Sequence, residues 1–276
     1  MDEVEFWLRD LKSRFDGIDK SEYYLSYSGG KDSHFLYWFI VYFLLDEEIE
    51  IVGINTFMEH REIRERIYAN SDRVLIPKVK PMEIKEQYGI PCFSKTQDGY
   101  IEKYQNGEVT EAVARRFFAK EPSWFNVSKK ARDYVLSKDA HRISNKCCYF
   151  LKKQVAREYE KKTGKKPILG VRQSESLQRN AQYTTCLTQT GTFVPIHDFT
   201  DEMMDKIYTK YGKEIGIPKI YEQVERTGCM GCPYGSYKGD TKKELQLVTP
   251  QQRKFLFKYF GESYEVLGIR KEDYEW

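Results

Sequence analysis

A lysine and two glycines stand where an apolar, strand-like segment gives way to a helix-like one, in YYLSYSGGKDSHFLYWFI at residues 23–40. A turn from a strand into a helix directs backbone N–H groups and the positive end of the helix dipole to one point, where phosphate binds. Gly29 and Gly30 permit a positive φ and close approach of a ligand, and Lys31 adds a positive charge. The spacing matches neither the Walker loop nor G-x-G-x-x-G, and the alternative to a phosphate-binding loop is a chance turn capped by serines. The predicted loop also holds four short polar side chains: Ser26, Ser28, Asp32 and Ser33.

Four of the six cysteines form two pairs far apart in the sequence, Cys147 with Cys148 and Cys229 with Cys232. Four thiolates at one site hold either zinc or an iron–sulfur cluster. Two adjacent cysteines strain a small zinc tetrahedron, whereas in a cubane each can bind a different iron. The pattern therefore favours a [4Fe-4S] cluster on these four cysteines, and the alternatives are a zinc site or buried apolar thiols.

These motifs resemble those of one protein family. SGGKDS resembles the PP-loop of the ATP-pyrophosphatase superfamily, and CC followed by CxxC is similar to the cluster signature of the adenylylsulfate reductases. LGVRQSESLQR at residues 169–179 is similar to the G-x-R-x-x-E-S-x-x-R segment of the phosphoadenylylsulfate reductase family. Because the three motifs span most of the chain, it is identified as a member of that broad family.

The resemblance implies an α/β fold, with a parallel-sheet PP-loop domain of the Rossmann-like, adenine nucleotide alpha hydrolase-like type. A helical insertion and a C-terminal Fe-S cysteine loop would complete it. The loop would hold the phosphates of ATP or of a sulfated adenylate. The adenine would lie against the end of the next strand at Asn55 and Thr56, where an ordinary polar strand end is the alternative.

The resemblance also implies roles in phosphate chemistry. It places Gly170 and Arg172 at the nucleotide. Lys31 and Arg172 would offset the negative charge that develops on the phosphates, and Asp32 would help to hold Mg²⁺. Glu175 would orient Arg172 or the ligand. The alternative is a structural Arg–Glu pair at the end of a strand.

Reductases of this family carry a nucleophilic cysteine in a C-terminal E-C-G-L-H-like segment, but no cysteine follows Cys232 here. Without that thiol no covalent sulfite intermediate forms, so reduction is not expected unless Cys92 or Cys186 substitutes. The remaining features resemble the sulfur-modification branch, which includes DNA phosphorothioation proteins of the DndC type and enzymes that thiolate tRNA bases. There ATP adenylates an oxygen, pyrophosphate leaves, and sulfur replaces the activated group. Cys186 is a candidate persulfide carrier, although a buried core cysteine is the favoured alternative.

The stretch from Ala112 to Lys146 is basic and aromatic, with nine Lys or Arg residues against three Asp or Glu residues. Such a stretch can bind nucleic acid through phosphate contacts and base stacking. A solvated basic face over a local aromatic core is an equally favoured alternative. The candidate residues are Arg115, Arg116, Phe117, Phe118, Trp124, Lys129, Lys130 and Arg132.

Strand-like and helix-like segments alternate in the first part of the chain, which predicts a parallel sheet. Strands are expected at 23–27, 50–55, 73–79 and 167–171, and helices at 4–15, 33–45, 61–69, 147–163, 201–211 and 249–260. The expected organisation is a first half of the nucleotide domain at 1–94, an inserted helical region at 95–146, and the second half with the cysteines at 147–276.

The composition, with 40% hydrophobic residues and a formal net charge of +3, is that of a globular protein. The longest apolar stretch, residues 35–45, is shorter than the roughly 20 residues that a membrane-spanning helix needs. The charged N-terminal segment does not resemble a secretory signal. A cytoplasmic protein without a membrane partner is expected.

Three functional hypotheses follow. The leading one is an ATP pyrophosphatase-type sulfurtransferase with a [4Fe-4S] cluster and Mg²⁺, which modifies DNA, tRNA or a nucleotide with sulfur from a donor such as a cysteine desulfurase. The second is a divergent adenylylsulfate or phosphoadenylylsulfate reductase. The third is a nucleotide-binding, redox-sensing module without turnover.

Overall fold

The computed structural model describes residues 2–225, 227–238 and 240–276. The chain forms two compact units, each assembled from stretches that are separated in the sequence. The predicted boundaries after residues 94 and 146 both fall inside the second unit. The first unit consists of Met1–Phe57, Arg61–Ile76 and Val155–Tyr221, and the second of Met58–His60, Pro77–Gln154 and Glu222–Trp276.

A parallel sheet forms the centre of the first unit, as predicted. Its strand order is β3-β2-β1-β4, and Leu25 of β1 pairs with Ile51 of β2 and Ile168 of β4. Because β1 lies between two neighbours, the turn that follows it leaves the sheet at an interior position. The strands are β1 (Tyr23–Tyr27), β2 (Glu50–Ile54), β3 (Arg73–Leu75) and β4 (Lys166–Ile168).

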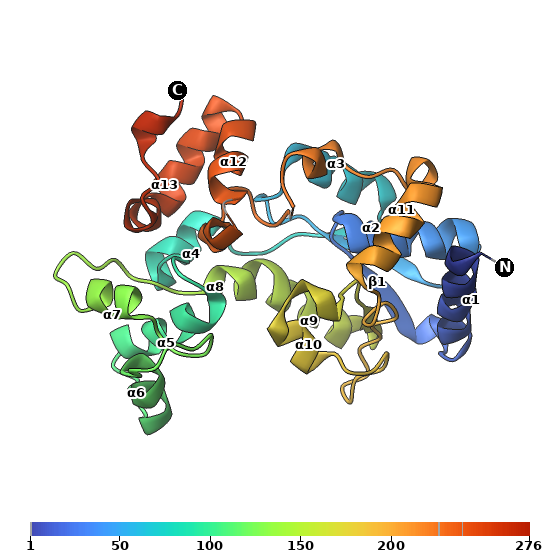
Figure 1. Cartoon of the computed structure of the whole chain (residues 1–276), viewed down its shortest axis with the longest axis horizontal. Helices are drawn as coiled ribbons and strands as arrows, with labels where there is room; N and C mark the ends of the chain where they lie inside the picture. Colours follow the sequence, from blue (N-terminus) through green and yellow to red (C-terminus); the bar gives the residue numbers. More distant parts are fainter. Residues whose placement is uncertain (1, 226, 239) are drawn as a thin grey trace. The chain divides into compact units, whose positions relative to one another are not determined.

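Alternate residues of β1 enter two different cores. Tyr23, Leu25 and Tyr27 point to one face of the sheet. There they pack in one large apolar cluster with α1, α2, α3 and α11. Tyr24 points to the other face, where its ring lies 4.9 Å from that of Tyr159 on α9. Figure 1 shows α1 and α11 side by side. The helices are α1 (Glu3–Asp16), α2 (Lys31–Trp38), α3 (Arg61–Asn70), α9 (Gln154–Thr163), α10 (Leu177–Gln182) and α11 (Asp201–Ile215).

Several elements differ from their predicted bounds, and two of these differences have a clear physical cause. The helix after β1 begins at Lys31 and passes into a π-helical turn at Phe39–Phe43, closed by the Leu44 N–H on the Phe39 carbonyl. β3 ends at Leu75, before Pro77, which lacks the N–H that a ladder needs.

The second unit is helical and has two cores. Cys147, α4 and α13 contribute to the larger core, and α5, α6 and α7 surround a smaller one that contains Phe117. No helix in the described ranges is both long enough and apolar enough to cross a membrane. The helices are α4 (Pro81–Tyr88), α5 (Lys95–Gln105), α6 (Glu111–Phe117), α7 (Lys129–Val135), α8 (Lys146–Cys148), α12 (Asp240–Leu247) and α13 (Pro250–Leu267).

We expect His34 to make the first unit less stable in acid. It is buried on α2, with Nε2 2.7 Å from the Ile215 carbonyl and Nδ1 2.7 Å from the Tyr27 hydroxyl, so the neutral ring donates to one and accepts from the other. Burial, assisted by the charge of Arg66, lowers the pKa of His34 to about 4. The unfolded chain therefore takes up a proton below about pH 6.5 that the folded chain does not, and about 2 kcal/mol of stability is lost between pH 7 and pH 5.

Urea unfolding at both pH values measures this loss. His34→Gln, which keeps a donor and an acceptor but does not titrate, should show a shallower pH dependence. An equally steep dependence in this variant would contradict the assignment.

Candidate functional site

The turn after β1 is built largely by its own residues. Gly29 has a φ of 72°, and a Cβ there would lie 3.0 Å from the Ile63 carbonyl oxygen. The Ser28 and Ser33 hydroxyls are 2.9 Å apart, and Ser33 Oγ donates to the Gly30 carbonyl at 3.1 Å. These two serines therefore hold the loop in shape, and their contact with a ligand stays a prediction. Ser26 lies further back, in β1, opposite Val52 of β2.

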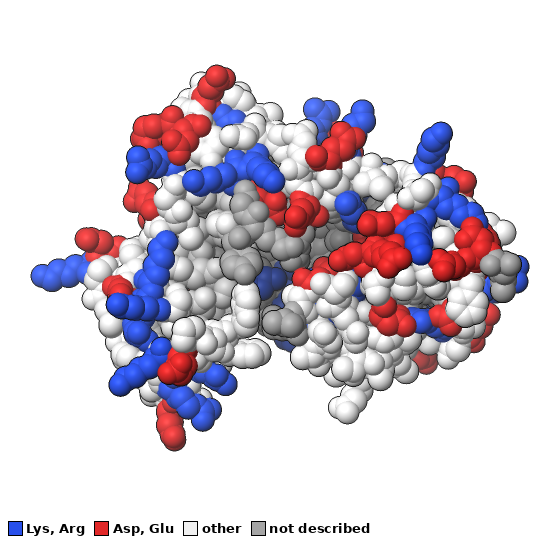
Figure 2. Space-filling model, in the orientation of Figure 1, with Lys and Arg blue, Asp and Glu red and all other residues white. Residues whose placement is uncertain are grey.

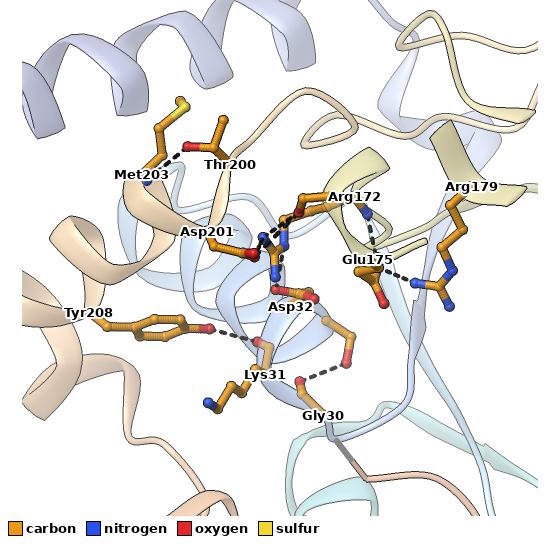
Figure 3. A network of polar contacts seen from close by, with 12 residues as sticks. Gly30, Lys31, Asp32, Arg172, Glu175, Arg179, Thr200, Asp201, Met203 and Tyr208 are labelled. Carbon is orange, nitrogen blue, oxygen red and sulfur yellow. Dashed lines mark hydrogen bonds and ion pairs between the residues drawn. The ribbon is translucent and has the colours of Figure 1, made fainter. Parts of the chain in front are cut away.

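Two tyrosines from distant segments contact the start of α2. The backbone N–H of Lys31 donates to Tyr221 Oη at 3.1 Å, and Lys31 Nζ lies 4.6 Å from the centre of the Tyr221 ring. Tyr208 Oη donates to the Lys31 carbonyl at 3.1 Å (Figure 3). The Tyr221 hydroxyl thus accepts the hydrogen bond of the Lys31 N–H. At the start of a helix, such an N–H can instead donate to a phosphate oxygen. Sequence reasoning missed both tyrosines, which lie in ordinary amphipathic segments.

Arg172 connects the turn with α11 (Figure 3). Its Nε donates to Asp32 Oδ1 at 3.1 Å and its Nη1 to Asp201 Oδ1 at 2.6 Å. Glu175 accepts the Arg172 backbone N–H at 3.0 Å and forms an ion pair with Arg179. Burial raises the pKa of Asp32, and the charge of Arg172 opposes that rise. Asp201, which lies in the first turn of α11, was not predicted.

Gly170, in the segment that contains Arg172, lies directly against the turn after β1. A Cβ on Gly170 would lie 2.8 Å from both the carbonyl carbon of Asp32 and the backbone nitrogen of Ser33. The two loops therefore meet backbone to backbone, at the carboxyl ends of neighbouring parallel strands, β1 and β4. Ligands of open α/β sheets bind at such an edge.

The remaining predicted nucleotide residues lie at the end of β2. Asn55 is buried, and its amide nitrogen donates to Tyr68 Oη at 2.9 Å while its amide oxygen accepts the Phe57 N–H at 2.9 Å. Thr56 is fully buried. The Asn55 amide is thus engaged within the unit, and its contact with adenine stays a prediction.

The four paired cysteines all belong to the second unit, and the other three affect the ionisation of Cys147. A hydrogen bond with Cys148 is the main cause that raises the pKa of Cys147, followed by burial and the charges of Cys148, Cys232 and Cys229. The same hydrogen bond is the main cause that lowers the pKa of Cys148 to about 6. In the described part of the chain, no three His, Cys, Asp or Glu side chains are already arranged around one metal position.

The surroundings of these cysteines suit a sulfur-rich anionic group. The charge of Cys229, with that of Glu59, raises the pKa of Lys152 against the effect of burial. The buried Tyr259 hydroxyl has no hydrogen-bond partner among the described residues, and it lies in the apolar core that contains Cys147. A buried donor without an acceptor costs about 1–3 kcal/mol, which a sulfur acceptor would offset. The positive charge and the unpartnered hydroxyl in this core favour a cluster on the four cysteines, which stays a prediction.

The two unpaired cysteines differ in exposure. Cys92 is fully buried, and burial raises its pKa to about 12. Cys186 is half-buried, with Sγ 3.6 Å from His197 Nδ1, and burial raises its pKa as well. Neither thiol is readily ionised at neutral pH.

Comparison with known proteins adds no family: no family model and no curated protein matches the chain.

We expect Gly170→Ala to destabilise the first unit by about 1–3 kcal/mol, because its methyl group must displace the backbone of Asp32 and Ser33. The affinity for ATP should fall together with the stability of this unit. Urea unfolding and calorimetric titration with ATP measure the two effects.

Gly212→Ala is the matched control: this glycine lies within α11 with no atom within 4 Å of the added Cβ, so the variant should be as stable as wild type or more so. Equal stability of both variants would show that the two loops do not meet as described.

We expect Tyr221→Phe to bind ATP or pyrophosphate about fivefold more tightly, because a ligand no longer displaces a hydroxyl whose hydrogen bond is worth about 1 kcal/mol. The ring that lies over Lys31 is retained. Tyr221→Ala separates the contribution of the ring from that of the hydroxyl. Calorimetric titration measures both, and weaker binding by Tyr221→Phe would mean that the hydroxyl contacts the ligand instead.

Proposed function

We propose that this chain is an ATP-dependent enzyme that adenylates an acceptor oxygen of a nucleic acid or nucleotide, so that sulfur can replace it. The observation that carries the proposal is the meeting of the Gly29–Gly30 turn with Gly170 and Arg172 at the start of α2. That edge combines helix N–H groups with the cations of Lys31 and Arg172, which is the chemistry that a polyphosphate requires.

In the proposed reaction an acceptor oxygen attacks the α-phosphorus of ATP and pyrophosphate leaves. Lys31 and Arg172 would stabilise the charge that passes to the leaving group. The acceptor is then joined to AMP, and a sulfur nucleophile from a donor such as a cysteine desulfurase attacks the activated atom as AMP departs. Because Asp32 is paired with Arg172, it would bind the Mg²⁺ of the nucleotide only if that ion pair opens.

Cys147, Cys148, Cys229 and Cys232 would hold a [4Fe-4S] cluster in the second unit. When bound, such a cluster would supply one-electron chemistry, because four thiolates occupy all four of its irons. Lys152 would offset part of its negative charge, and the Tyr259 hydroxyl would donate to one of its sulfurs.

Sulfonucleotide reduction is the second candidate, and Cys186 is the observation that favours it. Its sulfur lies beside an imidazole, as in activated nucleophiles, although burial raises its pKa. Cys92 is too deeply buried to serve as the nucleophile.

Incubation with labelled ATP, Mg²⁺ and a pool of DNA and tRNA tests the proposal. Pyrophosphate release stimulated by nucleic acid is the expected result, and Lys31→Met should abolish it. Sulfite release from sulfated adenylates with thioredoxin would overturn the proposal in favour of reduction. Tight nucleotide binding without turnover would leave a binding module.

A further inference from the structure

The connection between α6 and α7 displays aromatic side chains to solvent. Phe118, Trp124 and Phe125 are 49%, 65% and 57% exposed, within a few residues of one another in the sequence. Phe117 is different, since it is buried in the smaller core and stacks on Tyr104 at 3.9 Å. Phe118 touches the edge of that core through Tyr104 and Phe117, but about half of it stays exposed.

Two arginines hold this connection in place. Arg132 Nη1 donates to the Phe117 carbonyl at 3.2 Å and to the Ala119 carbonyl at 2.9 Å. Arg116 Nη1 donates to Asn126 Oδ1 at 3.1 Å, and its guanidinium lies 5.9 Å from the centre of the Phe125 ring. Both arginines order the segment that presents the rings, and their predicted contact with phosphate stays a prediction.

Other cations of the same stretch are exposed to solvent. Between Ala112 and Arg132 there are six Lys or Arg residues and one acidic residue, Glu121. Figure 2 shows Lys and Arg side chains gathered over α5, α6 and α7. The exposed cations of this stretch are Arg115, Lys120, Lys129 and Lys130.

We propose that this surface, formed by Phe118, Trp124, Phe125 and those four cations, binds single-stranded nucleic acid. The cations complement the phosphates, and the rings can stack only on bases whose faces are free, which a duplex does not offer. An acidic protein would satisfy the cations but gives no reason for ordered, exposed rings. The inference deepens the proposed function and rests on it for the identity of the acceptor.

Fluorescence anisotropy with labelled oligonucleotides tests the surface without ATP. We expect oligo-dT or oligo-U to bind at least tenfold more tightly than a duplex of the same length. Trp124→Ala/Phe125→Ala should weaken single-strand binding at least about 30-fold, because two rings are lost and each stacked base is worth about 1–3 kcal/mol. Lys129→Ala/Lys130→Ala should lower the slope of log K against log salt by about 1.4, which corresponds to two phosphates.

Phe6→Ala is the control, because that ring is 57% exposed on α1 in the first unit. Equal affinity for duplex and single strand, or unchanged binding by Trp124→Ala/Phe125→Ala, would overturn the inference. Binding confined to an acidic peptide would also overturn it. Tight single-strand binding without any ATP turnover would contradict the proposed function but support this binding surface. Turnover on single strands that is unchanged in Trp124→Ala/Phe125→Ala would support the proposed function but contradict the binding surface.

Discussion

Arg172→Met will lower kcat/KM for pyrophosphate release at least 100-fold and will destabilise the first unit. The guanidinium is 12% exposed and pairs with Asp32 and Asp201. Its removal takes a cation from the phosphate site, where one such interaction is worth about 3–4 kcal/mol in the transition state. It also leaves the Asp32 carboxylate buried without its partner, at a cost of about 3–5 kcal/mol.

Two further variants separate these effects. Asp32→Asn/Arg172→Met removes the orphaned carboxylate, so it should recover most of the stability without recovering activity. Arg14→Met is the matched control: Arg14 is 18% exposed and pairs with Asp198 in the same unit. Urea unfolding and steady-state kinetics on the folded fraction measure both properties. Full activity in Arg172→Met would remove this residue from the site.

Cys229→Ser will lower the iron content of anaerobically purified protein from about four atoms per chain to less than one, since a [4Fe-4S] cluster takes four thiolates. The visible thiolate-to-iron absorption should disappear with the iron. Because Cys229 packs against the apolar core that contains Cys147, the variant should also unfold at a lower urea concentration. Metal analysis, the absorption spectrum and unfolding provide independent readouts.

Cys186→Ser, outside the four cysteines, is the control and should keep both iron and colour. Tyr259→Phe tests the surroundings: the cluster should assemble, and its reduction potential should fall because a hydrogen bond to sulfur is lost. A colourless wild-type protein with one tightly bound zinc would contradict the cluster and support the zinc alternative.

Short-range features of the chain could be read from its sequence, because they depend on backbone preferences of neighbouring residues. β1 has its predicted bounds, and Gly29 has the positive φ that a turn from strand to helix needs. The parallel sheet followed from the alternation of strands and helices. The π-helical turn after α2 was not predictable, since an apolar run is compatible with either helical hydrogen-bond pattern.

The partners of the site residues could not be predicted from the sequence around each residue. Asp201, Tyr208 and Tyr221 contact Lys31 or Arg172 only because α11 and the segment after it pack beside α2 in the fold. Likewise, the hydrogen bonds of Arg132 to backbone carbonyls could not be read from its sequence neighbours, and its contact with phosphate stays a prediction.

The sequence by itself determined which chemistry is present: a glycine turn with a lysine, an arginine segment, four paired cysteines and a basic aromatic stretch. The tertiary structure alone decided which of these side chains face solvent and which are used to build the fold. Residue type and spacing limit what a group can do, whereas its burial and its partners depend on the order of strands in the sheet and on contacts between distant segments.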